Sequence, residues 1–386
     1  MSLSADDSDS SRRARRQPGT AVIVCCVASG VVHNVTFVLA GRALAGHPWF
    51  LLCSTTAASA LIYGLWSACA AFRVRGPSRT QRVACGWWWY PTHCAGISAL
   101  VVLSGTAAQL ANVHVSGLDQ TLLNQLALPL TVLASRVATG TRCSRQQALG
   151  VAIVTAASLL PLVLGGGAGG GAGWLLVFAL SQVPAAAVSV WEQTLLSRAQ
   201  GAPLPLHSPE LLYLTATSVL ALAGYAGLAL VAWFCLDGGA GARALAEEQA
   251  RAVLALVGTA VAPLVVCGYV ASQVVYYHAH ALLARRGSAS FQPLADSLVA
   301  PLSAVALVLL AQGGDRTRAA QWALLAVSCC GIGAGVWMFA TARDVLVTCG
   351  AFRSSPPRVT IVVVAPKPTL VSRPVLRGQE DCVLIV

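Results

Sequence analysis

Charged side chains are scarce in this sequence. Asp, Glu, Lys and Arg together make up 10% of its 386 residues, whereas hydrophobic residues make up 56%. Soluble globular domains contain about 25% charged residues. Disordered chains contain few apolar residues and many charged ones. The composition therefore excludes both classes and predicts an integral membrane protein, which has the lipid bilayer as its first partner.

Lysine is almost absent, because Lys367 is the only one among 25 basic residues. The arginines form no cluster on a candidate folded face with aromatic residues between them, which excludes a nucleic-acid partner. The net charge of +11 therefore needs another explanation. The arrangement of the chain in the membrane provides one.

Signatures of cofactor and metal sites are also missing. The stretch GGGAGGGAG at 165–173 lacks the Lys-Ser/Thr of a phosphate-binding loop, so we expect a flexible connector there. The 13 cysteines include no CxxC pair, and no His stands at zinc spacing. The motifs H-E-x-x-H and G-x-S-x-G are absent as well. We therefore expect no cofactor, no metal site and no enzymatic activity.

Ten apolar runs are long enough to cross a hydrocarbon core about 30 Å thick, which takes about 20 helical residues. They predict an all-α polytopic membrane protein with ten transmembrane helices joined by short connectors. The approximate bounds of the runs are 19–44, 48–72, 92–116, 118–138, 146–165, 172–197, 209–235, 252–281, 287–312 and 319–342.

Basic residues are distributed unequally among the connectors. With ten alternating spans, 20 of the 25 Lys and Arg residues fall on the side of the two termini, and five fall on the other side. Cytosolic connectors are the ones enriched in basic residues. We therefore expect a cytosolic N-terminal tail at 1–18 and a cytosolic, disordered C-terminal tail at 343–386.

An internal repeat links the fourth and ninth spans. The stretch DQTLLNQLALPLT at 119–131 matches FQPLADSLVAPLS at 291–303, and every matched pair has the same separation along the chain. A constant separation of nearly half the chain is expected if five helices were duplicated. Because five is odd, the second copy enters the membrane from the opposite side. The sequence therefore predicts an inverted repeat of five plus five helices, at 19–165 and 172–342, which is typical of secondary transporters.

The matched residues place one polar stripe on each of these two helices. Positions i, i+4 and i+11 fall within about 40° of one another on a helix. We also expect a kink at each matched proline, because proline cannot donate the helical hydrogen bond. The stripes consist of Gln120, Asn124 and Thr131 in the fourth span and Gln292, Asp296 and Ser303 in the ninth, and the kinks are expected at Pro129 and Pro301.

Two acids lie inside predicted spans. A carboxylate near mid-span, such as Asp296, costs about 2.5–3.5 kcal/mol even on a lenient insertion scale, so such groups usually mark a functional pathway. Asp296 is therefore a candidate proton site. Glu192 either faces a cavity or pairs with Arg198 at the end of its helix. For His278 and His280, which lie near a helix end, we expect snorkelling toward the interface.

Similarity to a known family extends over about residues 21–342. The most specific motifs are LLNQLALPLT in the fourth span and GSA followed by LADSLVAPLS in the ninth. The stretches GVVHNVTFVLAGRALAGHPWF and LSQVPAAAVSVWEQTLL add to them. Together they resemble the chloroquine-resistance-transporter-like family of the drug/metabolite transporter superfamily.

The resemblance implies a ten-helix carrier with a cavity lined by spans 1–4 and 6–9. Members are associated with vacuolar or plastid membranes and with export of peptides, thiols, amino acids or cationic drugs, in some cases coupled to protons. By matching position, Gln125 and Pro129 would be cavity and kink residues of the fourth span, Pro301 the kink of the ninth, and Glu192 the acid near the end of the sixth. The chain departs from the family at Asp296, where an apolar residue is common.

We expect a secondary transporter that moves a small polar or cationic solute by alternating access, with Asp296 or Glu192 carrying a coupling proton. A nucleotide-sugar or sugar-phosphate exchanger is one alternative, although it would need basic residues facing the cavity. A membrane scaffold or receptor is another, although it would need no duplicated polar stripe. The expected solute-binding residues are Gln120, Asn124, Gln125, Thr131, Gln292, Asp296, Ser303, His33 and Asn34.

Overall fold

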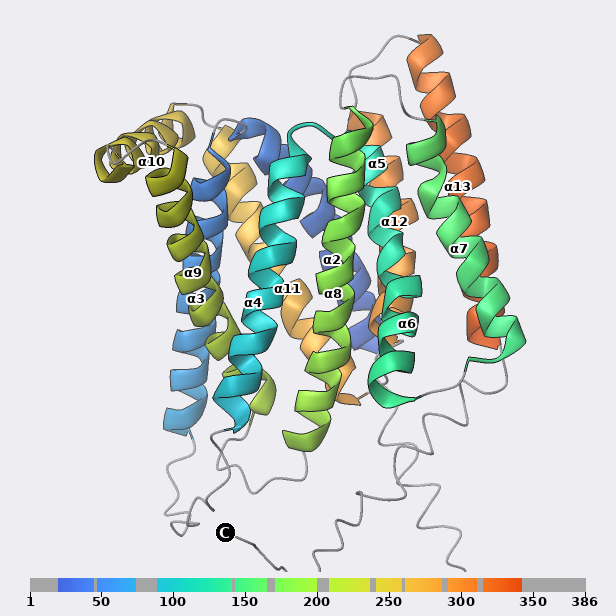
Figure 1. Ribbon diagram of the computed structural model, residues 1–386, viewed down its shortest axis with the longest axis horizontal. Helices are drawn as coiled ribbons and strands as arrows, with labels where there is room; N and C mark the ends of the chain where they lie inside the picture. The colour runs from blue at the N-terminus through green and yellow to red at the C-terminus, as the bar shows by residue number, and fades with distance from the viewer. Residues whose placement is uncertain are drawn as a thin grey trace, which may run out of the picture. The chain divides into compact units, whose positions relative to one another are not determined.

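Helices form every regular element that the computed structural model describes (Figure 1). The described residues are 20–44, 47–73, 89–140, 143–164, 171–199, 208–236, 241–258, 261–286, 291–310 and 315–341. Both expected tails lie outside them. The elements are α2 (Thr20–Ala43), α3 (Pro48–Arg73), α4 (Trp89–Asn112), α5 (Gly117–Leu123), the 3-10 turn η1 (Asn124–Leu126), α6 (Ala127–Thr139), α7 (Arg145–Leu164), α8 (Ala172–Ala199), α9 (Pro209–Leu236), α10 (Gly241–Val257), α11 (Val261–Arg286), α12 (Phe291–Leu310) and α13 (Asp315–Thr341).

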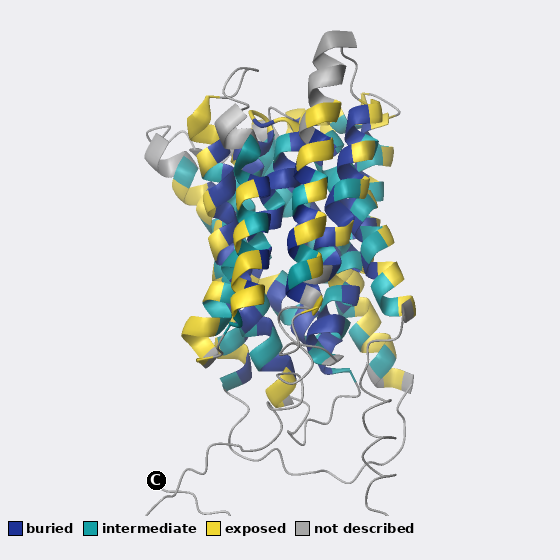
Figure 2. Ribbon diagram, turned by 90° about the vertical axis from the view of Figure 1, so that its right-hand side faces the viewer, coloured by how far each residue is buried: buried dark blue, intermediate teal, exposed yellow. Residues whose placement is uncertain are grey.

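Six helices within the described residues are long and apolar enough to cross a membrane. Exposed residues lie on the outer faces of the helices and buried ones on the faces between helices (Figure 2). Many of the exposed side chains are large and apolar, such as Val137 at 81% and Trp337 at 71% exposure, as expected for contact with lipid. The protein is therefore an integral, multi-pass membrane protein. The six segments are Ala21–Ala43, Pro48–Ala70, Trp89–Asn112, Ala172–Arg198, Pro209–Ala232 and Val261–Arg285.

The expected span at 252–281 is wrong in its first part. The chain turns at Gly258, and the residues before it form the separate helix α10, which continues back through a stretch expected to be a loop. Pro263 provides the physical reason. In a helix that begins at Val261 it stands in the first turn, where its missing N–H has no partner to lose, whereas in one unbroken helix it would stand in the interior. Figure 1 shows α10 lying across the end of α9.

The tightest helix pairs join elements that are far apart in the sequence. Helix α2 packs on α11, α3 on α9, α4 on α8, and α7 on α13. Two further contacts, α12 with α2 and α6 with α8, connect these pairs. Each of the six contacts combines one helix that ends before residue 165 with one that begins after residue 171. Neither part of the chain therefore completes its packing alone.

Glycines allow α7 and α13 to approach closely. A methyl group added at Gly150 would lie 2.5 Å from the carbonyl oxygen of Gly335, and one added at Gly335 would lie 2.6 Å from that of Gly150. Small residues at such crossings let two membrane helices bring their backbones together. The α7–α13 contact therefore depends on the lack of a side chain at these two positions.

The helical region that carries the first polar stripe is irregular at its middle. Ser116 caps its start, because its hydroxyl accepts a hydrogen bond from the backbone N–H of Asp119 at 3.2 Å. The α-helical pattern then tightens into the 3-10 turn η1 shortly before Pro129. By contrast, α12 runs through Pro301 without interruption. Both prolines stay predicted kinks.

Candidate functional site

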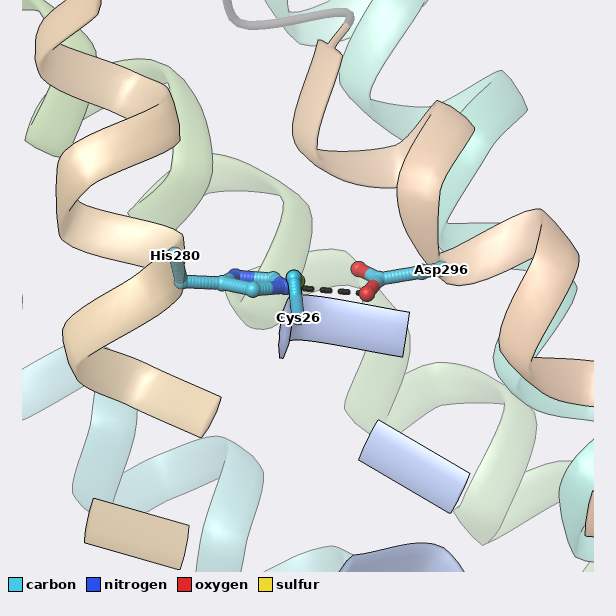
Figure 3. A group of neighbouring side chains, drawn as sticks. All are labelled: Cys26, His280 and Asp296. Atoms are coloured by element: carbon cyan, nitrogen blue, oxygen red, sulfur yellow. Dashed lines mark hydrogen bonds and ion pairs between the residues drawn. The ribbon is translucent and has the colours of Figure 1, made fainter. Parts of the chain in front are cut away.

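Asp296 lies at the centre of a polar cluster inside the bundle. The hydroxyl of Tyr276 donates to its Oδ1 at 2.7 Å, and Nε2 of His280 lies 2.9 Å from the same oxygen. Figure 3 shows His280 from α11 and Asp296 from α12 pointing toward each other, with Cys26 of α2 beside the bond that joins them. The Asp296 side chain is 26% exposed.

Gln292 connects this cluster to the second acid. Its amide nitrogen donates to the backbone oxygen of His280 at 3.1 Å and to Oε2 of Glu192 at 3.4 Å. Glu192 is buried in α8, whereas Arg198 at the end of the same helix is exposed. That Glu192 faces a cavity stays a prediction. Among the described residues, no ion pair involves Glu192.

An aromatic stack borders the cluster. The ring of His33 in α2 lies between Tyr269 and Tyr276 of α11, with ring centroids 5.1 Å away on each side. Tyr277 meets the same ring edge-on at 5.8 Å. The His33 Nδ1 atom is buried and has no hydrogen-bond partner in the described structure. The stack reaches Asp296 through Tyr276, whose hydroxyl donates to the carboxylate. Aromatic rings and an acidic group therefore lie side by side.

The 3-10 turn η1, which lies in the fourth expected span, reaches the cluster through Gln125. Its amide nitrogen lies 3.4 Å from the backbone oxygen of Asp296 and donates to it. Asn124 and Asn34 are half-buried. The 3-10 turn η1 thus meets α12 beside the acid.

Other predicted site residues have different surroundings. The amide nitrogen of Gln120 donates to the side-chain oxygen of Asn112 at 2.7 Å and to the backbone oxygens of Asn112 and Val115 at 3.0 and 2.9 Å. Gln120 therefore holds the end of α4. Thr131 and Ser303 are fully buried, and their hydroxyls have no hydrogen-bond partner within the described residues.

Three cluster residues were missed in the sequence. Tyr276, His280 and Cys26 were not among the predicted site residues, and the snorkelling expected for His280 is wrong, because the ring points into the bundle and meets Asp296. A signal was present: Tyr269, Tyr276 and His280 follow one another at spacings of seven and four, which places them on one helix face. The nearness of His280 to the helix end concealed it.

The cluster combines groups that can bind positive charge. Asp296 and Glu192 are carboxylates, His280 and Gln292 connect them, and aromatic rings lie alongside. Ionisable residues inside membrane spans usually mark solute or proton pathways. The helices that contribute are α2, α8, α11 and α12, with η1 in contact.

Comparisons with known proteins concern the family and the fold of the chain. The family model described as CRT-like, chloroquine-resistance transporter-like, matches residues 20–225. "Crt homolog 1" of Dictyostelium discoideum is 29% identical over 176 residues, which cover 44% of this chain and 36% of that protein. The aligned part thus spans about a third of the relative's length.

A solved structure shows a similar fold. A chain described only as "Crystal structure of protein" superposes with a TM-score of 0.50 at 18% identity, covering 87% of this chain and 99% of the other. At that identity the likeness concerns the fold alone. The family match covers more than half of the sequence, and the chain therefore belongs to the CRT-like, chloroquine-resistance transporter-like family.

Proposed function

We propose that this protein is a secondary transporter that moves a small polar or cationic solute across a membrane by alternating access. The observation that carries the proposal is the polar cluster of Asp296, His280, Gln292 and Glu192, built from three helices inside the bundle. Ionisable side chains inside membrane spans are expensive, so those that occur usually mark a pathway or a binding site. Membership of the CRT-like family supports the same class of activity.

The architecture that we propose for this transporter is an inverted repeat of five plus five helices, at 19–165 and 172–342. The helix contacts support it. If α2, α3, α4, α6 and α7 correspond in order to α8, α9, α11, α12 and α13, then the contact of α2 with α11 becomes that of α8 with α4, and the contact of α12 with α2 becomes that of α6 with α8. Both partners of each exchange occur in the structure.

Matched glutamines support the same repeat. Gln120 donates to the backbone oxygen of Asn112, near the end of α4, and Gln292 donates to that of His280, near the end of α11. The two glutamines occupy the same place in the two matched stretches, and each bonds to the long helix that precedes its own. The acceptors lie 8 and 12 residues before their glutamines, so the two bonds are similar in kind and differ by one helical turn.

We propose a cationic or polar solute because of what surrounds Asp296. A carboxylate that is partly exposed can pair with a positive group. The tyrosine ring of Tyr276, whose hydroxyl bonds to this carboxylate, lies beside the same group, and a cation over the face of such a ring gains about 0.5–2 kcal/mol. Gln125, Asn124 and Asn34 would add hydrogen bonds from the other side.

We assign the coupling proton to Glu192 in preference to Asp296. Asp296 already meets an imidazole and a phenol, whereas the group that donates to Glu192 is a neutral amide. A proton that arrives at Glu192 therefore displaces no cationic side chain. Cytosolic termini and an endomembrane location such as a vacuole or plastid complete the proposal, on the basis of the distribution of basic residues and of the family.

Flux through reconstituted vesicles tests the function. We expect uptake of one member of a panel of peptides, glutathione, basic amino acids and quinoline-like cations, with a rate that a pH gradient changes. Asp296→Asn should abolish most of the uptake, and Glu192→Gln should remove its response to the gradient. Asp119→Asn is the matched control, because that acid lies in α5 beside Ser116. Equal uptake and equal gradient response in all four proteins would contradict the proposal.

A further inference from the structure

Cys26, His280 and Asp296 converge from three helices. Their potential ligand atoms, Sγ, an imidazole nitrogen and a carboxylate oxygen, all lie within 4.8 Å of one another. They come from α2, α11 and α12, so the convergence results from the packing of distant parts of the chain. Cys26 is fully buried, and the other two side chains are 13% and 26% exposed.

We propose that these three residues bind one transition-metal cation of the Zn²⁺ class. Zn²⁺ is bound by thiolate sulfur at about 2.3 Å and by imidazole nitrogen and carboxylate oxygen at about 2.0–2.2 Å. In a tetrahedral site these lengths place neighbouring ligand atoms roughly 3.3–3.7 Å apart. The three ligand atoms lie within 4.8 Å of one another, and Nε2 of His280 and Oδ1 of Asp296, now 2.9 Å apart, would exchange their hydrogen bond for bonds to the ion. The site goes beyond the proposed transport function and does not depend on it.

The ligand set selects the class of ion. Ca²⁺ and Mg²⁺ prefer all-oxygen sites, whereas one thiolate, one imidazole and one carboxylate suit Zn²⁺ and its neighbours. A thiolate and a carboxylate together carry the charge that a divalent cation neutralises, and buried charges in proteins are usually paired or bound to metals. On binding, the thiol of Cys26 gives up its proton to solvent and its sulfur forms the bond to the metal.

The surroundings of the carboxylate strengthen the assignment. Tyr276 donates to Oδ1 of Asp296 at 2.7 Å and therefore fixes the orientation of the carboxylate toward His280. Such outer partners of metal ligands hold them in position, and their loss typically lowers metal affinity about 10- to 100-fold. Three protein ligands leave a fourth position for water or for a ligand atom of a solute.

The site could not be found from ligand spacing. His280 and Asp296 lie in two successive helices, and Cys26 lies near the opposite end of the chain. The expectation of no metal site came from the lack of CxxC and His spacings, which detect ligands contributed by one local segment. Here each ligand comes from a different helix.

Cobalt binding to the purified full-length protein tests the proposal. Co²⁺ substitutes for Zn²⁺ and produces a thiolate-to-cobalt charge-transfer absorption that only a Cys ligand can give. We expect one Co²⁺ per chain, this absorption in the wild type, and its displacement by Zn²⁺. Cys26→Ala should lose the absorption, and Asp296→Asn and Tyr276→Phe should weaken binding about tenfold or more.

The neighbouring Cys25 offers a matched control. It lies next to Cys26 in the same helix but is exposed, so Cys25→Ala should bind Co²⁺ like the wild type. No absorption in the wild type, or an equal one in Cys26→Ala, would overturn the proposal.

Because cobalt binding measures equilibrium occupancy, its result is separate from that of the flux assay.

Discussion

The stretches 119–131 and 291–303 carry matched residues in different surroundings. In both, the glutamine donates to the backbone of the preceding long helix, Gln120 at 3.0 Å and Gln292 at 3.1 Å. One turn further along, Asn124 and Asp296 are both half-buried. They differ in charge, and the carboxylate of Asp296 is bonded to Tyr276 and His280. The glutamine connects neighbouring helices in both stretches, whereas bonded ionisable side chains surround the second position in 291–303.

Exchanging the two divergent residues should have the largest effect on uptake. We expect Asp296→Asn to lower uptake about tenfold or more, because loss of a charged partner from a desolvated pair costs about 2 kcal/mol or more. Adding Asn124→Asp should fail to restore it, since Tyr276 and His280 direct their polar atoms to position 296. Uptake by reconstituted vesicles measures both, and normal rates in the double variant would show that the two positions are interchangeable.

Alanine at the two matched glutamines should separate support from chemistry. Gln120→Ala leaves two backbone oxygens and the Asn112 side chain without their donor, so we expect a loss of about 1–3 kcal/mol in stability. Gln292→Ala also removes the partner of Glu192 and should alter the response to a pH gradient more than Gln120→Ala does. Thermal unfolding and uptake at two gradients check this, and the reverse ranking would contradict it.

A third change lies away from the polar stripes, at the contact of α7 with α13. In Gly150→Ala the new methyl group would meet the backbone of Gly335 and Phe339 at 2.5 and 2.9 Å, which should lower stability by about 1–3 kcal/mol. Gly333→Ala is the matched control, because within the described residues nothing lies within 4 Å of that position. Unfolding temperatures distinguish them, and we expect uptake per folded molecule to stay similar in both.

The smallest effect is expected at the prolines. Pro129→Ala should let the 3-10 turn η1 relax toward a regular helix, which would move Gln125 away from the backbone oxygen of Asp296. Pro301 already lies in an unbroken helix, so Pro301→Ala should change uptake less. A larger loss in Pro301→Ala than in Pro129→Ala would show that the second kink matters more.

Much of the helical architecture could be predicted from apolar length. Nine of the ten expected runs overlap helical segments whose ends differ from them by at most four residues, because apolar length is a strong signal for such segments. The tenth run, 252–281, began too early. The last residues of α10, such as Leu254 and Val257, are apolar, so the hydrophobic signal extends from α11 back across the break at Gly258. Pro263, five residues after that glycine, indicates that a new helix begins there, and a hydropathy profile does not detect this signal.

The candidate site was harder to predict. Asp296 and Glu192 stand out because acids are expensive in hydrocarbon. Cys26 resembles any small apolar filler, and only the packing of α2 against α11 and α12 brings it to His280. Pairing of distant helices has no local signature in one sequence.

The stacking of His33 between Tyr269 and Tyr276 has a consequence for biosynthesis. Helix α2 leaves the ribosome long before α11 is complete, because most of the chain lies between them. At about 5–20 residues per second, α2 spends roughly 10–50 s in the membrane without its partner. During that time His33 and Cys26 lack the α11 side chains that they meet in the complete bundle. Among the tightest helix pairs, α2 therefore waits longest for its partner.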